Sequence, residues 1–410
     1  MRKVGNYRNH SRRARWVAWI IDTFLFFLLW IKRFFRKLFF PFRSVSRRNE
    51  PFSVAGKILL IRLDHLGDLL MTTPAISAIK SSFPQSTLHL LGGPSALALA
   101  PGLPQIKKTF TFSVPWYDGG RAQLFSVRQY VCLIRKLRQE KYDAVIDFRG
   151  DIRILVLFAL LSGAPVRVGY SRLGGESLLT HSVPFDTSAH FVVGNLSLIQ
   201  TLTGSARIEA DPQPSIIPTR EDRAYIQRLL ESMGERQNSR WVVIHPTTIP
   251  HWQLKRWPPE RFATLADELI HHEGIRIIFT GTEMDAPALD LIIANMKAPA
   301  LNLARKTSLL GLAALLERCA LFVSGDTGPM HLAAAVGAPL VAIFGPTESA
   351  RSGPYGQAHR IRVLQHPIPC RRPCYVSRCP AEHRCMREIS VTEVLWACRE
   401  LLAVQKKGEK

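Results

Sequence analysis

The stretch "SGDTGPMHLAAAVGAPLVAIFGPTES", residues 324–349, decides the fold class of this 410-residue chain. It predicts a strand end, a loop, a helix and a second strand, because short continuous apolar runs are typical of buried strands in parallel sheets. Gly325 and Gly328 bracket Asp326 and Thr327 just where the helix begins. The free N–H groups at a helix start form an anion site, so the stretch predicts a place for a phosphate.

Two interpretations of the polar residues in this stretch stay open. Asp326 is either the N-cap of the helix or a ligand for sugar hydroxyls beside the phosphates. His331 is correspondingly either a packed helix residue or part of the same loop site.

The same alternation of strand and helix continues in both directions from this stretch. Strand patterns occur at 57–63, 87–91, 142–148, 241–246, 276–281, 321–325 and 339–345, and helix patterns at 69–83, 127–139, 152–163, 258–272, 308–319 and 328–337. A proline-rich stretch without periodicity, 207–220, separates two such series. We therefore predict an α/β fold of two Rossmann-like, doubly wound domains whose strand carboxyl ends face a shared cleft.

A second polar loop precedes a proline-started helix in "HPTTIPHWQLKRWPPERF", residues 245–262. The hydroxyls of Thr247 and Thr248 and the charge of Lys255 suit a diphosphate, with Lys255 meeting the departing oxygen. The alternative is a solvated loop in which Lys255 is incidental. At the end of the next strand, Glu283 or Asp285 is placed to accept hydrogen bonds from sugar hydroxyls.

The first strand of the chain is followed by the loop "DHLGD", residues 64–68. Gly67 permits close backbone approach, and a carboxylate at a strand end is a candidate general base for an acceptor hydroxyl. Asp64 and Asp68 are both candidates, and the residues alone leave the choice open. Asp68 as a helix N-cap is the structural alternative.

The 50 amino-terminal residues hold 13 Lys and Arg but 2 acids, about half of the chain's net charge of +22. They flank the apolar run 16–31, which favours an anionic membrane surface over nucleic acid as the partner. A spanning helix needs about 20 apolar residues, so we favour an in-plane or re-entrant anchor over a span. The alternative, in which this segment is a core helix of the folded domain, is disfavoured because it would have to bury two basic clusters.

Further features place the body of the protein relative to this membrane. The basic residues of "KRFFRKLFFPF", residues 32–42, recur at helical spacing and would reach lipid phosphates. No small-residue cleavage site follows the apolar run, which argues against a signal peptide. Positive charge on both sides of the run predicts that the body stays cytoplasmic.

A cysteine cluster lies near the carboxyl end in "CRRPCYVSRCPAEHRC", residues 370–385. A cytoplasmic location disfavours disulfides, and the C-x3-C-x4-C-x5-C spacing lacks the C-x2-C pairs of structural zinc sites. A bound metal, reduced packing thiols and opportunistic disulfides stay open.

Two long segments carry a family resemblance: "KILLIRLDHLGDLLMTTPAISAIK" (57–80) and residues 302–349, which contain the opening stretch. They resemble the bacterial lipopolysaccharide heptosyltransferases of glycosyltransferase family nine. The likeness runs from about Lys57 to Glu393 and includes "RVGY", "KRWPPERF" and the cysteine-rich tail in the expected order.

The resemblance implies a GT-B fold and inverting transfer from an ADP-sugar, usually ADP-heptose, to a lipid A or core-oligosaccharide acceptor, without a cofactor or required metal. It implies an enzyme at the cytoplasmic face of the bacterial inner membrane. The resemblance carries over Asp68 as the general base, Thr247, Thr248 and Lys255 as the diphosphate site, and Asp326, Thr327, Gly328 and His331 as the donor-sugar and phosphate loop. Together with the residues argued from the sequence itself, the predicted site has Asp68 and Lys255 as catalytic residues, adds Glu283 to the donor-binding residues, and has Gly67 and Arg62 on the acceptor-side loop.

The resulting domain prediction has four parts. They are a membrane-anchoring segment 1–50, an acceptor domain 51–206, a nucleotide-sugar domain 207–365 and a cysteine-rich segment with a closing helix, 366–410. Two departures from the family stand out: Arg305 occupies a position where many members have glycine, and residues 1–50 have no counterpart. Another nucleotide-sugar donor, and a non-catalytic nucleotide-sugar binder, are the alternative functions.

Overall fold

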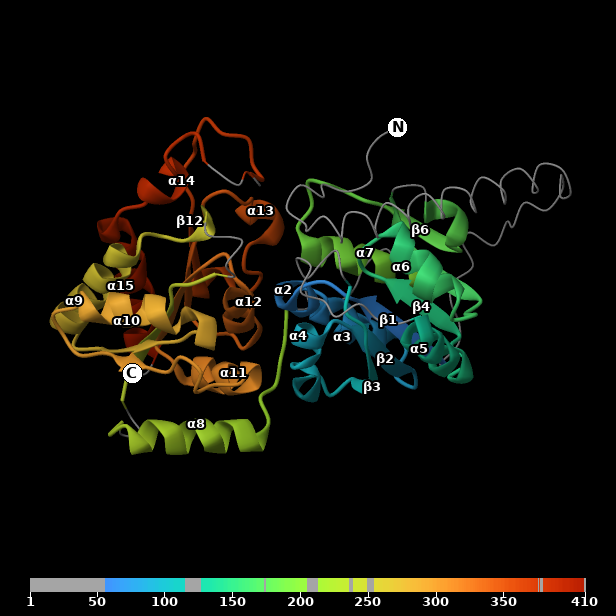
Figure 1. The fold of residues 1–410 in the computed structure, drawn as a ribbon, viewed down its shortest axis with the longest axis horizontal. Coiled ribbons are helices and arrows are strands. Elements are labelled where there is room, and N and C mark those ends of the chain that lie inside the picture. Colours follow the sequence, from blue (N-terminus) through green and yellow to red (C-terminus); the bar gives the residue numbers. More distant parts are fainter. Residues whose placement is uncertain are drawn as a thin grey trace, which may run out of the picture. The chain divides into compact units, whose positions relative to one another are not determined.

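The computed structural model describes residues 56–114, 127–172, 175–204, 213–235, 239–248, 254–374, 376 and 379–408 (Figure 1). The predicted membrane anchor, residues 1–50, lies outside these ranges. Within them, no helix combines the length and the apolar character needed to cross a bilayer.

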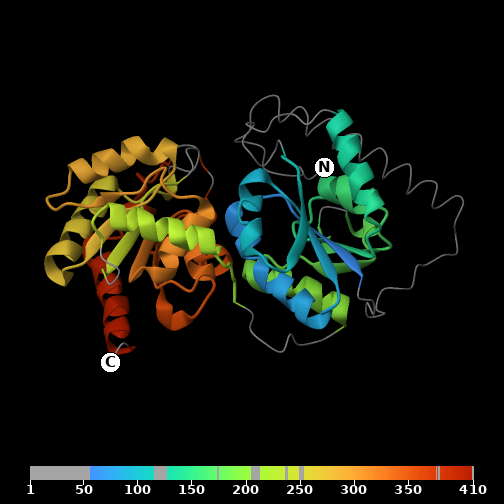
Figure 2. The ribbon, with the colours of Figure 1, turned by 90° about the horizontal axis from the view of Figure 1, so that it is seen from below.

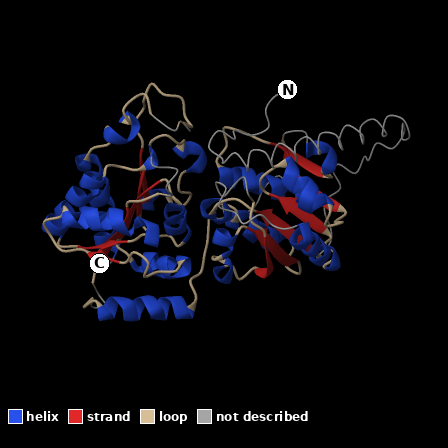
Figure 3. Cartoon of the chain, viewed as in Figure 1, coloured by secondary structure: helices blue, strands red, loops and turns tan. Residues whose placement is uncertain are grey.

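The chain divides into two compact units. Unit 1 comprises residues 1–100, 105–187 and 192–212, and unit 2 comprises 101–104, 188–191 and 213–410. In each, the described residues form a six-stranded parallel sheet with helices beside it (Figure 3), which confirms the predicted fold of two doubly wound α/β units. The boundaries of the four predicted segments remain a prediction.

The first half of the chain follows the predicted alternation of strands and helices. Its elements are β1 (Lys57–Arg62), α2 (Leu66–Leu70), α3 (Thr73–Ser82), β2 (Thr87–Gly92), α4 (Pro94–Leu97), the 3-10 helix η2 (Ala100–Gly102), β3 (Ile106–Thr111), α5 (Val127–Gln139), β4 (Ala144–Asp147), α6 (Ile152–Ile154), the π-helix η3 (Leu155–Leu160), β5 (Val166–Ser171), the 3-10 helix η4 (Gly175–Leu178), β6 (His181–Pro184) and α7 (Phe191–Thr203).

The second half repeats the pattern after the link. Its elements are α8 (Arg220–Ser232), β7 (Trp241–His245), α9 (Pro259–Glu273), β8 (Arg276–Phe279), the 3-10 helix η6 (Glu283–Asp285), α10 (Ala286–Ala294), β9 (Leu301–Asn302), α11 (Leu309–Arg318), β10 (Leu321–Gly325), α12 (Gly328–Ala335), β11 (Leu340–Ile343), α13 (Ser349–Ser352), the 3-10 helix η7 (Ala358–Arg360), β12 (Ile361–Leu364), α14 (Arg384–Arg387) and α15 (Val391–Gly408).

The two sheets have the same strand order. The sheet of unit 1 runs β3-β2-β1-β4-β5-β6, and that of unit 2 runs β9-β8-β7-β10-β11-β12. In both, the chain starts in the middle, winds to one edge and then returns to wind to the other. The direction therefore reverses between β1 and β4 and between β7 and β10, where ligands of doubly wound sheets bind beyond the strand carboxyl ends.

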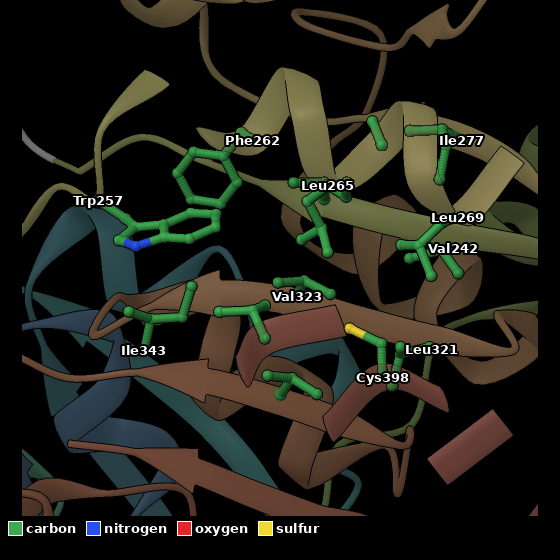
Figure 4. Close-up of a cluster of buried hydrophobic side chains, with 14 of the residues drawn as sticks. Val242, Trp257, Phe262, Leu265, Leu269, Ile277, Leu321, Val323, Ile343 and Cys398 are labelled. Carbon is green, nitrogen blue, oxygen red and sulfur yellow. The ribbon is translucent and has the colours of Figure 1, made fainter. Parts of the chain in front are cut away.

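Unit 2 is built around a core between its sheet and the helices α9, α10 and α15. Trp257 and Phe262 pack edge to face with ring centroids 4.9 Å apart (Figure 4), and Cys398 of α15 is buried in the same cluster. The indole N–H of Trp257 donates to the carbonyl oxygen of Ile389 at 2.9 Å. On the other side of the sheet, α11 contacts both α12 and α8. Helix α8 runs alongside α11 (Figures 1 and 2). The carboxyl-terminal helix is therefore part of the core of unit 2.

Local structure differs from the sequence prediction at two places. The predicted loop 64–68 already contains the start of α2, because His65 caps a short helix from Leu66. Arg305, the position where a glycine is common in the family, has φ of 65° in the left-handed region that favours glycine. The backbone there keeps a glycine-like conformation although it carries a long side chain.

We predict that the packing of α15 into the core of unit 2 contributes much of the stability of that unit. Leu401 is 2% exposed in the core, so Leu401→Ala should lower the free energy of unfolding by about 2–5 kcal/mol. Trp396, on the same helix, is 65% exposed, and Trp396→Ala should change it by less than about 0.5 kcal/mol. Urea unfolding of the full chain measures both, and equal losses would contradict the packing of α15.

Candidate active site

The candidate residues lie in loops that follow the central strands of the two sheets. Arg62 ends β1, and Gly67 and Asp68 lie in α2 just beyond it. Ile61 of β1 is in register with Asp147 of β4, so the loop after β4 begins beside Arg62. In unit 2, Ser324 of β10 is in register with His245 of β7. Polar residues that follow β7 and β10 are therefore neighbours.

Asp68 is held by two donors from its own loop. The backbone N–H of His65 donates to Oδ2 of Asp68 at 3.1 Å, and a guanidinium nitrogen of Arg62 donates to Oδ1 at 3.2 Å. The first contact is the carboxylate half of a capping box, so Asp68 caps the helix from its third position while His65 is the N-cap. The Asp68 side chain remains 16% exposed, which leaves it accessible to a substrate.

Asp64 has a different environment. Its side chain is 1% exposed and lies between Arg62, 3.0 Å away, and Arg149, 3.1 Å away. Burial raises the pKa of Asp64 above its usual range. Burial alone would also raise the pKa of Asp68, but the nearby charge of Arg62, with His65 and Arg149, brings it below the usual value. Asp68 is therefore the carboxylate that is both ionised and reachable, which favours it over Asp64 as the base.

In unit 2 two of the predicted site residues, Lys255 and Asp326, contact each other. Nζ of Lys255 lies 2.6 Å from Oδ2 of Asp326, with the side chains 16% and 10% exposed. The hydroxyl of Thr347 donates to the same carboxylate oxygen at 2.7 Å. Thr347 follows β11 and was not predicted from the sequence, because its part in the site depends on which strand lies next to β10. The group forms a compact charged site at the carboxyl edge of the sheet.

The two threonines that follow β7 are buried. Thr247 is 3% exposed and Thr248 is 7% exposed. Among the described residues, the hydroxyl oxygen of Thr247 has no hydrogen-bond partner. A buried polar atom without a partner is costly in a folded protein unless a ligand or water satisfies it. This atom therefore supports a polar ligand at the end of β7.

The start of α12 is arranged as the opening stretch predicts, with one change. Thr327, not Asp326, is the N-cap, and its hydroxyl accepts from the backbone N–H of Met330 at 3.4 Å. Asp326 is thereby free of a capping role and points its carboxylate to Lys255. Gly328 opens the helix, and His331 is buried in it at 6% exposure. An added Cβ on Gly325 would lie 3.4 Å from the carbonyl oxygen of Lys255, so the backbone at Lys255 packs closely against the end of β10.

Glu283 lies apart from this group. Its side chain is 79% exposed and forms an ion pair with Arg305 at 3.4 Å. The alternative at that strand end, Asp285, is buried and accepts from the backbone N–H and hydroxyl of Thr282 at 2.8 and 2.6 Å. The structure thus places neither carboxylate in contact with Lys255 or Asp326 among the described interactions, and the donor-binding role of Glu283 remains a prediction.

The cysteine-rich segment contacts the backbone next to the site residues of unit 2. The sequence alone did not predict this contact. The ring of His383 hydrogen-bonds the carbonyl oxygen of Leu254, next to Lys255. The N–H of Cys374 donates to the carbonyl oxygen of Pro346 at 2.8 Å, next to Thr347. The segment therefore contacts the backbone on both sides of the Lys255–Asp326–Thr347 group.

The thiols of this segment line one small cavity: Cys370, Cys374, Cys379 and Cys385, all in the free form. Burial raises the pKa of Cys385 to about 11. Within the described part of the chain, no three His, Cys, Asp or Glu side chains are gathered as a metal ion requires. The four thiols therefore share one cavity, and whether they hold a metal ion stays open.

Comparisons with known proteins identify the family of this chain. A sequence model described as "Glycosyltransferase family 9 (heptosyltransferase)" matches residues 130–383. Lipooligosaccharide heptosyltransferase 2 of Haemophilus influenzae is 35% identical over 319 residues, 75% of this chain and 89% of that protein.

Solved structures show the same fold. A family 9 glycosyltransferase from Veillonella parvula has a TM-score of 0.76 at 23% identity and covers 86% of this chain and 99% of its own. An ADP-heptose lps heptosyltransferase II from E. coli has a TM-score of 0.69 at 22% identity, with 85% and 99% covered.

We predict that Lys255 serves the diphosphate of a nucleotide ligand. Lys255→Ala should weaken the binding of ADP by about 10- to 100-fold, the range for a charge-assisted contact, and leave adenosine binding nearly unchanged. Calorimetric titration of both ligands measures the difference. Lys297→Ala, which removes an exposed lysine of the same unit, is the control and should bind both ligands as the unaltered chain does. An equal loss for ADP and adenosine would show that Lys255 does not meet the diphosphate.

Proposed function

This chain belongs to glycosyltransferase family 9, the heptosyltransferases, and on that premise we propose that it transfers a heptose from ADP-heptose to a hydroxyl of a lipopolysaccharide core. The family makes it a glycosyltransferase. The donor and acceptor are those named for the structural neighbour from E. coli, an ADP-heptose lps heptosyltransferase.

The observation that carries the donor proposal is the charged group in unit 2. Lys255 is held at the carboxyl edge of the sheet by Asp326, which directly precedes the N-cap of α12. The Thr247 hydroxyl, which follows the neighbouring strand β7, is buried and has no hydrogen-bond partner among the described residues. An ammonium group, helix N–H groups and a buried hydroxyl together suit a diphosphate. On donor binding, Lys255 exchanges part of its contact with Asp326 for the diphosphate, and Asp326 becomes available to sugar hydroxyls.

The proposed chemistry uses one residue group from each unit. Asp68 accepts the proton of the acceptor hydroxyl, whose oxygen forms the new bond to the anomeric carbon of the heptose. The bond from that carbon to the diphosphate breaks, and ADP leaves with the electron pair. In-line attack inverts the configuration at the anomeric carbon. The growing charge on ADP is stabilised by Lys255 and the N–H groups of α12, an interaction that strengthens toward the transition state.

Charge supports an anionic acceptor. The chain has a net charge of +22, and only about half of it lies in residues 1–50, so the remainder is basic as well. A basic surface attracts a glycolipid that carries phosphates and acidic sugars. This field favours encounter with the acceptor but does not choose the hydroxyl that is glycosylated.

We further propose that residues 1–50 hold the enzyme at the cytoplasmic face of the bacterial inner membrane. The support is their composition, an apolar aromatic run between basic clusters. Such a segment combines burial of apolar side chains in the interface with attraction to anionic lipids. The acceptor, a membrane glycolipid, would then be met at the surface where it is made.

The donor and the base are tested together by ligand-induced shifts in melting temperature and by turnover. ADP-heptose should stabilise the chain selectively over ADP-glucose, UDP-sugars and GDP-sugars, because a ligand that binds only the folded state raises its stability. Asp68→Asn should keep this shift while turnover falls by about 100-fold or more, since the proton acceptor is lost.

Two results would contradict the proposal. Selective stabilisation by another nucleotide-sugar would move the enzyme away from heptose transfer, and turnover in Asp68→Asn equal to that of the unaltered chain would remove Asp68 as the base. Stabilisation by none of the donors would favour a protein without this activity.

The membrane proposal predicts sedimentation with lipid. The full chain should bind vesicles that contain phosphatidylglycerol, and the chain lacking residues 1–50 should remain in solution. A variant with Lys32, Arg33, Arg36 and Lys37 changed to Gln tests the charge alone. It should bind several hundredfold more weakly, because four basic residues at roughly 1 kcal/mol each contribute about 4 kcal/mol near the surface. Undiminished binding after deletion would contradict the anchor.

A further inference from the structure

The arginine beside the candidate base has its nitrogens engaged by protein groups. The Arg62 side chain is 3% exposed, and one terminal nitrogen donates to Oδ1 of Asp68 at 3.2 Å. The other terminal nitrogen donates to the carbonyl oxygen of Phe148. Nε lies 3.0 Å from Oδ1 of Asp64, in ion-pair contact without the alignment of a hydrogen bond. Such a guanidinium is fixed by the fold and is not placed to bind a substrate.

Asp64 holds this guanidinium from the inside of the unit. Its two carboxylate oxygens contact two arginines: Arg62 on one side, and Arg149 at 3.1 Å on the other. Both Arg62 and Asp64 come from the end of β1, whereas Arg149 comes from the loop after β4. The switch point between β1 and β4 therefore contains two carboxylates that share one buried cation, and only one of them, Asp68, is exposed.

We propose that Arg62 is a positioning residue that keeps Asp68 ionised and oriented for proton transfer, and that Asp64 anchors Arg62 for this task. The inference rests on the proposed role of Asp68 in transfer. It assigns functions to a buried pair that does not itself touch the substrate.

The physical reason is the cost of burying a charge. Burial disfavours the ionised form of a carboxyl group, and a neutral Asp68 cannot accept a proton. The charge of Arg62 reverses this preference. Because the same guanidinium is also paired with Asp64, it is not committed wholly to Asp68, and the carboxylate retains more basicity than in an isolated ion pair. The charged and titratable groups around the pair are His65, Asp64, Arg149, Asp147 and Tyr170.

The first test is the pH dependence of kcat/KM for transfer from ADP-heptose to lipopolysaccharide with a truncated core. For the unaltered chain we expect no loss of activity down to about pH 5, since the pKa of Asp68 is below its usual value. In Arg62→Gln the largest opposing charge is lost and only the smaller effects of His65 and Arg149 oppose burial, so the pKa of Asp68 should rise. Activity should then fall at low pH, by roughly tenfold per pH unit below the new pKa. Arg62→Lys keeps the cation and should restore the profile of the unaltered chain.

Arg153→Gln is the matched control. Arg153 is also buried and paired with a buried carboxylate, Asp151, at 2.9 Å in the same unit. Loss of Arg153 should lower the free energy of unfolding, but it should not make kcat/KM fall at low pH. An Arg62→Gln profile that is scaled down but unchanged in shape would overturn the proposal, because it would show a structural role alone.

Chemical labelling separates this inference from the proposed reaction. A protonated carboxyl group adds to a water-soluble carbodiimide: its oxygen bonds to the central carbon and its proton passes to a nitrogen. An added amine then displaces the urea to leave a stable amide, and mass spectrometry of the Asp68 peptide measures it without any transfer assay. At pH 6 we expect the label on Asp68 to be at least about tenfold stronger in Arg62→Gln than in the unaltered chain, reflecting the larger protonated fraction. Equal labelling would overturn the role of Arg62 even if heptose transfer is confirmed. Absence of transfer alongside the expected labelling would instead count against the proposed function.

The anchoring role of Asp64 is tested by a double-mutant cycle. Asp64→Asn should reduce kcat more than it raises KM in the unaltered chain, and should have little further effect on kcat in the Arg62→Gln background. Equal effects in both backgrounds would show that Asp64 does not act through Arg62. Because loss of a buried carboxylate in unit 1 is destabilising, urea unfolding of each variant checks that unit 1 is folded under the assay conditions.

Discussion

The carboxyl edge of a parallel sheet is the constraint on which the candidate site depends. The carboxyl ends of all strands in such a sheet lie at the same edge. Where the strand order reverses, the loops that follow two neighbouring strands lead in opposite directions. In unit 2 this places Lys255, which follows β7, against Asp326, which follows β10, although 71 positions separate them in the chain. In unit 1 it places the loop after β4 beside the base that follows β1. The same strand order thus produces a polar site in each unit.

Paired charges are the common chemical feature of these two sites. Asp68 is held by Arg62, and Asp326 by Lys255 and Thr347. A buried charge that loses its partner strongly destabilises a protein. These ion pairs therefore keep the protein stable when no substrate is bound. They also store the groups that the reaction needs: an ionised carboxylate for the acceptor hydroxyl, and a cation for the diphosphate. The cysteine-rich segment fits this account as a backing for the second site, since His383 and Cys374 contact the backbone beside Lys255 and Thr347.

The sequence predicted the central strands and the residues that follow them, because these strands are buried on both faces and appear as continuous apolar runs. It missed the four edge strands β3, β6, β9 and β12, whose residues are mostly exposed or half-buried, and β5, which lies next to an edge. Lys255 and Asp326 were predicted in one donor site. Thr347 and Arg149 were not predicted, since their positions depend on which strands are neighbours and no local motif marks them. The choice between Asp64 and Asp68 likewise required the burial of each carboxylate.

The most direct test of the central claim is product analysis after incubation of the full chain with ADP-heptose and lipopolysaccharide whose core lacks heptose. The account predicts one heptose added per acceptor, with one ADP released for each transfer, as measured by mass spectrometry of the acceptor and chromatography of the nucleotide. Release of ADP without a change in acceptor mass, or no reaction of either substrate, would contradict it.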